Sequence, residues 1–199
     1  MWLSSSPLVL ASKSAVRRAV LESAGIPVEV VPGGVDERTI EANAGVTDPR
    51  GAASLLARSK ALAVSPLRPG QLVLGADQTL ALGSRRFSKP IDRAAARHQL
   101  QTLRGQTHVL HSALAVVRDG TVLYDHVEPA RLTMRGFSDD ALDRYLDTAG
   151  DTVLASVGGY QLERIGIHLF ERIDGDHFTI LGMPILPLLA FFRQAGVVA

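Results

Sequence analysis

The chain alternates short apolar runs with longer stretches of helical periodicity, and this alternation limits it to an α/β or α+β fold. We expect strands at Val28–Val31, Gln71–Gly75, Thr79–Leu82, His108–Val117, Val122–Val127, Ala130–Met134, His168–Ile173 and Phe178–Leu181. We expect helices at Ser14–Ala24, Pro49–Ser65, Arg93–Leu103, Asp139–Thr148 and Pro184–Gln194. No repeat or long linker interrupts the pattern, so we expect a single domain over residues 1–199 with a cleft between two lobes.

Local signals indicate where several of these elements begin and end. Asp48 followed by Pro49 is typical of a helix start, and Gly25 is typical of a helix end. The pairs Gly83-Ser84 and Asp119-Gly120 favour hairpin turns between neighbouring strands.

The composition excludes several classes of protein. The 21 basic and 20 acidic residues are interspersed and leave a net charge of +1, so no general attraction to nucleic acid is expected and any anion site must be local. The absence of cysteine excludes disulfides, thiolate zinc sites and cysteine nucleophiles, and it fits a cytoplasmic protein. The most apolar stretch, Ile180–Phe192, is short and is broken by glycine and proline, so no membrane association is expected.

The segment from Leu8 to Arg18 has the features of a phosphate site. An apolar run ends in the small residues Ala11 and Ser12 and passes directly into a helical pattern that carries Arg17. Small side chains let a ligand approach the backbone, a helix N-terminus offers unpaired N–H groups to an anion, and arginine adds forked donors. The alternative is an ordinary strand-to-helix connection in which Ser14 caps the helix.

Asp77 follows a second apolar run, Leu72–Gly75. A carboxylate at the end of a buried strand costs free energy unless a cation, a hydrogen-bond donor or a catalytic role offsets it, so Asp77 is a candidate site residue. The alternative is that Asp77 only closes a turn through its own backbone.

Three further charged residues could join such a site. Lys89 precedes a proline that holds its backbone extended, Glu37 ends another apolar stretch, and Lys60 lies on a predicted helix with its stem along the apolar face. The alternatives are a solvated surface lysine for Lys89 and an exposed loop acid for Glu37. Two acids with lysines and an arginine favour magnesium and a polyphosphate, whereas the chain lacks both the P-loop motif and a zinc ligand set.

The order of these motifs resembles the Maf family of nucleoside triphosphate pyrophosphatases over nearly the whole chain. The matching motifs are L-A-S-x-S-x-x-R-R, V-D-E, a helix with lysine, G-A-D, a K-P pair, L-x-G-x-T-H, G-x-x-L-F-E-R-I-x-G-D and G-x-P. The resemblance implies an α/β fold of the Maf or ITPase-like type, with a central mixed sheet flanked by helices and a deep nucleotide-binding cleft between two lobes. It also implies a homodimer.

The reaction implied by the resemblance is hydrolysis of a nucleoside triphosphate between the α- and β-phosphates, with a divalent metal, Mg²⁺ or alternatively Mn²⁺. Matched residue by residue, the family's functional positions fall on Ser12, Arg17, Glu37, Lys60, Asp77 and Lys89. The resemblance places the proton acceptor at Asp77 and the phosphate contacts at Ser12, Arg17, Lys60 and Lys89. Glu37 and Asp77 are then expected to hold the metal.

Three positions linked to base choice in the family fall on Val16, Gln78 and Glu163. The branch that acts on 7-methyl-GTP has Trp, Gln and Glu there, and the branch that acts on pyrimidine triphosphates (dTTP and UTP) has Arg, Thr and Gln. The chain therefore resembles the first branch at Gln78 and Glu163 but not at Val16, where the aromatic ring is missing. For Glu163 the alternative is a surface acid paired with Arg164 or Arg172.

Two other functions stay open on the sequence alone. The chain could bind a nucleotide or nucleic acid without turnover, since family members are also linked to inhibition of septum formation. It could also be an interaction module, which would have no need for acids after apolar strands. Pyrophosphate release with magnesium distinguishes the enzyme from both.

Overall fold

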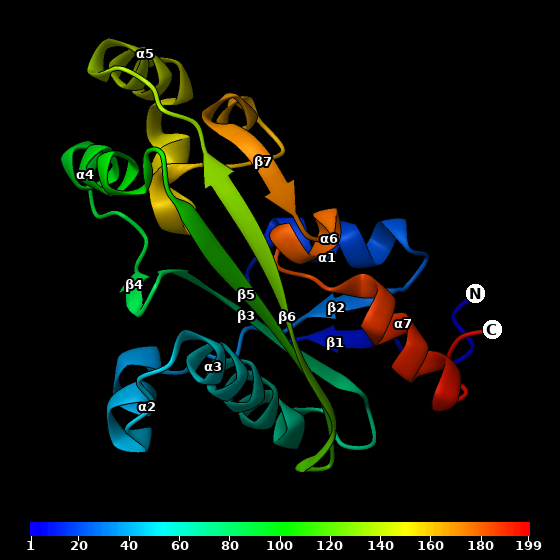
Figure 1. Ribbon diagram of the computed structural model, residues 1–199. Helices are drawn as coiled ribbons and strands as arrows, with labels where there is room; N and C mark the ends of the chain where they lie inside the picture. Colours follow the sequence, from blue (N-terminus) through cyan, green and yellow to red (C-terminus); the bar gives the residue numbers. More distant parts are fainter. The chain divides into compact units, whose positions relative to one another are not determined.

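The computed structural model describes residues 1–199, in which seven strands form one mixed sheet (Figure 1). The strands follow the order β2-β1-β3-β5-β6-β7, and β4 pairs with β3 outside this path. β1 is parallel to β2 and β3, whereas β4 is antiparallel to β3 and β7 is antiparallel to β6. The strands are β1 (Leu8–Leu10), β2 (Val28–Val30), β3 (Val73–Leu82), β4 (Arg85–Phe87), β5 (Thr107–Arg118), β6 (Thr121–Met134) and β7 (Phe170–Asp174). The mixed sheet expected from the sequence is confirmed.

The helices lie between these strands along the chain. The α-helices are α1 (Ala15–Ser23), α2 (Glu37–Ala44), α3 (Pro49–Val64), α4 (Arg93–Leu103), α5 (Asp139–Ala149), α6 (His177–Ile180) and α7 (Ile185–Gln194). The short 3₁₀ helices are η1 (Ser65–Leu67), η2 (Gly150–Leu154), η3 (Val157–Gly159) and η4 (Ile165–Leu169). None of them combines the length and the apolar character that a membrane-spanning helix requires.

The chain divides into two compact units, each assembled from separate segments. The first unit consists of Met1–Gln78, Ser112–Glu128 and Asp176–Ala199, and the second consists of Thr79–His111 and Pro129–Gly175. The chain therefore passes between the units several times, and the single domain over residues 1–199 stays a prediction.

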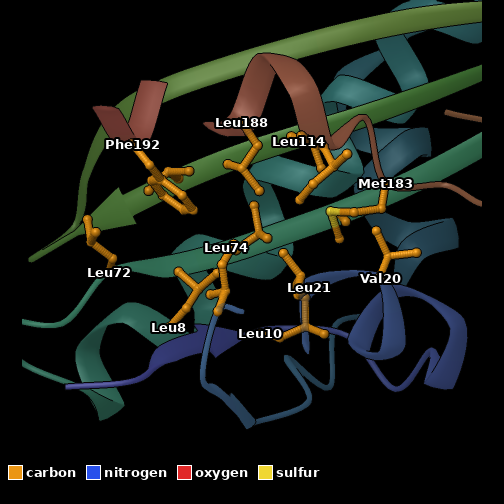
Figure 2. Close-up of a cluster of buried hydrophobic side chains, with 14 of the residues drawn as sticks. Leu8, Leu10, Val20, Leu21, Leu72, Leu74, Leu114, Met183, Leu188 and Phe192 are labelled. Atoms are coloured by element: carbon orange, nitrogen blue, oxygen red, sulfur yellow. The ribbon is translucent and has the colours of Figure 1, made fainter. Parts of the chain in front are cut away.

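In the first unit, apolar side chains cover both faces of the sheet. Because successive side chains of a strand point to opposite faces, Leu8 and Leu10 pack on one face and Val9 on the other. Figure 2 shows the first face, where α1 and α7 contribute to a cluster that includes Leu8, Leu10, Val20, Leu21, Leu72, Leu74, Leu114, Met183, Leu188 and Phe192. The second face packs against Ala57 and Ala61 of α3.

In the second unit, polar contacts add to the packing of α4 and α5. Arg97 of α4 forms an ion pair with Asp143 of α5 at 2.7 Å.

The second unit also contains a buried histidine, His108 of β5. Its Nε2 atom lies 2.7 Å from the hydroxyl of Tyr160, and burial lowers the pKa of His108 to about 4. The imidazole is therefore neutral at physiological pH.

Two strands are longer than predicted. β3 runs without interruption through Asp77 and Gln78, and β6 runs through Pro129. In each of these two regions the sequence predicts a pair of shorter strands instead of one long strand. Polar residues inside β3 break the apolar pattern, but their side chains have partners in the folded chain. The predicted strand ends at Gly75 and Val127 are therefore wrong.

Two helices were not expected from the periodicity. α6 replaces the strand predicted at Phe178–Leu181, because the carboxylate of Asp176 accepts hydrogen bonds from the backbone N–H and the hydroxyl of Thr179 and caps a helix. α2 is capped by Asp36 and ends at Gly45, which has a φ of 62°. No residue of α2 is buried, so it has no apolar stripe for a sequence pattern to detect.

Candidate active site

Asp77 lies in the middle of β3, not at its end and not in a turn. Val73 packs on the face covered by α3, and the two-residue alternation places Gly75 and Asp77 on the same face. The strand-end position and the turn alternative considered for Asp77 are therefore both wrong. The carboxylate is buried beneath α3.

Gly75 lets α3 approach β3 closely. A Cβ atom at Gly75 would lie 2.0 Å from the carbonyl oxygen of Ala57 and 2.9 Å from the backbone nitrogen of Ala61, both in α3. These are backbone atoms, so the whole helix would have to move to accept a methyl group. The missing side chain therefore determines how near Lys60 comes to Asp77.

We expect Gly75→Ala to lower the free energy of unfolding by at least ~2 kcal/mol and to reduce activity, because α3 and Lys60 are displaced from β3. Gly136→Ala is the matched control, since a Cβ atom there meets nothing within 4 Å. Urea unfolding of the two variants measures the difference. Equal stability of the two variants would contradict the close approach at Gly75.

Lys60 connects two carboxylates. Its Nζ atom lies 2.5 Å from Oδ1 of Asp77 and 2.7 Å from Oε1 of Glu37, the first residue of α2. The side chains of Lys60 and Asp77 are largely buried, whereas that of Glu37 is 52% exposed. Lys60 is largely buried, in line with the predicted position of its stem. Glu37 is exposed, as the alternative for it had it, but it begins α2 and pairs with Lys60, so its place in a loop is wrong.

The environment of Asp77 raises the pKa of its carboxyl. Burial is the largest cause, and the nearby charge of Glu37 acts in the same direction. The charges of Lys60 and Arg17 and the hydrogen bond from Lys60 oppose it. A general base is most effective when its pKa approaches the working pH, so this shift suits a carboxylate that accepts a proton.

Arg17 is held against the backbone on the other side of β3. Its Nη1 atom donates to the carbonyl of Ala76 at 2.7 Å and to Oγ of Ser12 at 3.3 Å, and its Nε atom donates to the carbonyl of Gly182 at 3.1 Å. Burial lowers the pKa of Arg17, while Asp77 and Glu37 counteract this effect, and an arginine stays charged in a protein. The guanidinium is thus a fixed positive charge within the first unit.

The N-terminus of α1 adds backbone donors beside this arginine. Ser14 caps the helix through its side chain, which accepts from the N–H of Arg17, as the sequence indicated. Ser12 accepts from the N–H of Ser14 and is buried. Capping leaves the other N–H groups of the first turn without helical partners, which is the arrangement that favours an anion.

Gln78 points to the face opposite Asp77. Its Nε2 atom donates to Oγ of Ser112 at 2.8 Å, to the carbonyl of Ile180 at 3.0 Å and to that of Thr179 at 3.2 Å. The amide nitrogen is therefore engaged inside the protein. Ser112 is a functional candidate that the sequence reasoning missed, although a serine within the apolar run of β5 is the signal that could have revealed it.

Three other predicted site residues form no contact with this cluster that the structure records, although Val16 is next to Arg17 in the chain. Val16 is half-buried in α1 of the first unit. Lys89 follows β4 and Glu163 lies between η3 and η4, both exposed and both in the second unit. Arg172 forms an ion pair with Asp174 at 2.9 Å, and Glu163 lies on the surface, so its role in base recognition stays a prediction.

The carboxylates of Glu37 and Asp77 fit a divalent cation in their chemistry. Both supply hard oxygen atoms, and both already contact one positive charge, the Nζ atom of Lys60. No group of three or more His, Cys, Asp or Glu side chains is arranged to hold a metal ion. Mg²⁺ usually takes one or two carboxylates and completes its shell with water and substrate phosphates, and its binding here stays a prediction.

Comparison with known proteins finds relatives over nearly the whole chain. The sequence matches the family of Maf-like proteins over residues 7–195. It is 56% identical over 194 residues to a protein of Rhodopseudomonas palustris named nucleoside triphosphate pyrophosphatase, with 98% of this chain and 96% of the relative covered. It is 50% identical over 190 residues to a protein of Brucella abortus named 7-methyl-GTP pyrophosphatase, with 94% and 95% covered. Among solved structures, a HAM1 protein from Coxiella burnetii has a TM-score of 0.42 at 15% identity, over 64% of this chain and 72% of that chain.

Proposed function

The chain belongs to the family of Maf-like proteins, and we propose that this hydrolase converts a nucleoside triphosphate to the monophosphate and pyrophosphate. The observation that carries the proposal is the buried carboxylate of Asp77 with Lys60 bonded to it. An acid in this position is costly for stability alone, and it is suited to accepting a proton from water.

In the proposed reaction, one water molecule attacks phosphorus at the bond between the α- and β-phosphates. Asp77 accepts the proton of the water, and the P–O bond to the leaving pyrophosphate breaks. Lys60 holds the carboxylate in place and adds positive charge, while Arg17 and the N–H groups of α1 bind phosphate oxygens. We assign the same phosphate role to Ser12 and Lys89.

Glu37 and Asp77 are the residues that would hold Mg²⁺, or alternatively Mn²⁺, in this proposal. When bound, the metal supplies positive charge that neutralises the phosphates. Both carboxylates also form ion pairs with Lys60.

We expect Arg17→Ala and Lys89→Ala each to lower kcat/KM by ~10- to 150-fold, by a similar factor for every nucleotide. The reason is that the phosphates are common to all of these substrates, whereas the base is not. Initial rates of pyrophosphate release with several triphosphates measure this, and thermal unfolding of each variant checks that the fold persists. A defect confined to one base would contradict the phosphate role.

Among the nucleotides, we propose a substrate of the 7-methyl-GTP type. Glu163 can accept hydrogen bonds from the N–H donors of a guanine edge. A relative from Brucella abortus is named 7-methyl-GTP pyrophosphatase. Val16 provides no ring to stack on the cationic base, so the alternative is a pyrimidine triphosphate such as dTTP or UTP.

A panel of triphosphates that includes 7-methyl-GTP, GTP, dTTP and UTP tests this choice. We expect Glu163→Gln to lower turnover of the guanine substrates ~5- to 150-fold more than that of UTP, because the amide turns one acceptor into a donor. Val16→Trp should favour 7-methyl-GTP over GTP. Equal effects of Glu163→Gln on GTP and UTP would remove Glu163 from base recognition.

A further inference from the structure

The C-terminal end of α6 is held by two side chains from the sheet. The carbonyl of Thr179 accepts from Oγ of Ser112 at 2.6 Å and from Nε2 of Gln78 at 3.2 Å. The carbonyl of Ile180 accepts from the same Gln78 nitrogen at 3.0 Å. The last carbonyls of a helix lack helical partners, so these side chains add to the hydrogen bond that the following turn makes.

The turn that follows α6 carries one of the anchors of Arg17. The N–H of Gly182 donates to the carbonyl of Thr179 at 2.9 Å, and Gly182 has a φ of +81°. Its carbonyl accepts from Nε of Arg17 at 3.1 Å, and a Cβ atom added there would lie 3.1 Å from the same nitrogen. The position of the α6 end therefore determines where this carbonyl meets the guanidinium.

Ser112 is a polar residue within an apolar strand. It is fully buried in β5, where the two-residue alternation places it on the same face as the buried Leu114. A buried hydroxyl is costly unless its hydrogen bonds are made, and here it donates to Thr179 and accepts from Gln78. The hydroxyl therefore links the end of α6 to Gln78 of β3.

We infer that Ser112, together with Gln78, is a positioning residue that fixes the α6 end so that Gly182 orients the guanidinium of Arg17 toward the substrate phosphates. This inference rests on the proposed function, which places Arg17 at those phosphates. It also gives Gln78 a role that does not depend on the base. Ser112 itself contacts no reacting group.

A double-mutant cycle between Ser112→Ala and Arg17→Ala tests the inference, because residues that act through one group are not additive. We expect Ser112→Ala alone to lower kcat/KM about 10-fold for all nucleotides and to have less than about a 2-fold effect in the Arg17→Ala background. The matched control is Ser65→Ala, which removes another fully buried hydroxyl, one that accepts from the N–H of Gly120. The control should keep the activity of the parent chain.

Binding of inorganic pyrophosphate, measured by calorimetry on the same variants, separates this inference from the proposed function. If the parent chain hydrolyses no nucleotide but binds pyrophosphate, the proposed function fails. The double-mutant cycle is then calculated from the pyrophosphate dissociation constants of the variants. If the effects of Ser112→Ala and Arg17→Ala multiply, or if Ser112→Ala equals Ser65→Ala, the positioning role is wrong. A parent chain with neither turnover nor pyrophosphate binding would overturn both.

Discussion

Asp77→Asn should reduce turnover ~10²–10⁴-fold at saturating substrate while the chain keeps its fold. The substitution removes the proton acceptor and a carboxylate expected to hold the metal, but it preserves the size of the side chain. The amide oxygen can still accept from Nζ of Lys60, which lies 2.5 Å from Oδ1 in the parent chain. The loss is therefore chemical and not structural.

Steady-state rates and thermal unfolding, measured together, check this prediction. Asp36→Asn is the matched control, because Asp36 caps α2 next to Glu37 and asparagine caps a helix about equally well. That control should turn over substrate at the parent rate. If Asp77→Asn kept more than about a tenth of the parent rate, Asp77 would not be the general base.

Lys60→Met should lower kcat/KM at neutral pH by ~10²–10³-fold and should move the acidic limb of the pH–rate profile to higher pH. The charge and the hydrogen bond of Lys60 lower the pKa of Asp77 against the effect of burial. Without them the pKa rises further, so Asp77 takes up its proton at a higher pH as the pH falls. Part of the lost activity should return in alkaline buffer.

Glu37→Gln provides a control of opposite sign for the same measurement. The charge of Glu37 raises the pKa of Asp77, so its removal should move the acidic limb to lower pH. Opposite displacements of the limb in the two variants would identify Asp77 as the titrating group. An acidic limb that stays in place in Lys60→Met would show that a different group titrates.

Local chemistry explains which parts of the fold could be predicted from the sequence. Ser14 and Asp48 cap helices as expected, because a cap needs only a side-chain oxygen within three residues of the N–H that it accepts from. Asp119 and Gly120 form the predicted hairpin turn with φ values of 49° and 76°. These features depend on neighbouring residues alone.

Long-range contacts explain what could not be predicted. Gln78 finds its partners in β5 and α6, 34 and 101 to 102 residues away along the chain. No residue near Gln78 in the sequence indicates those partners, so the polar pair Asp77-Gln78 inside an apolar run predicts a strand end. The role of Gly75 could not be predicted either, because it depends on the backbone of α3, which is distant in the sequence.

The site itself was predicted in part. Lys60, Asp77 and Glu37 come together, and Ser12 lies against Arg17, as expected from their charges and from the family resemblance. The roles of these residues stay predictions, as do those of Lys89, Glu163 and Val16. The nucleotide-binding cleft, the homodimer, the divalent metal and the cytoplasmic location are also predictions, which follow from the resemblance or from composition.

Identification of the products by ³¹P NMR tests the proposed reaction. The purified chain would be incubated with a nucleoside triphosphate and Mg²⁺, with Asp77→Asn in parallel. We expect equal amounts of nucleoside monophosphate and pyrophosphate from the parent chain and almost none from the variant. Formation of nucleoside diphosphate and inorganic phosphate, or equal product from both chains, would contradict it.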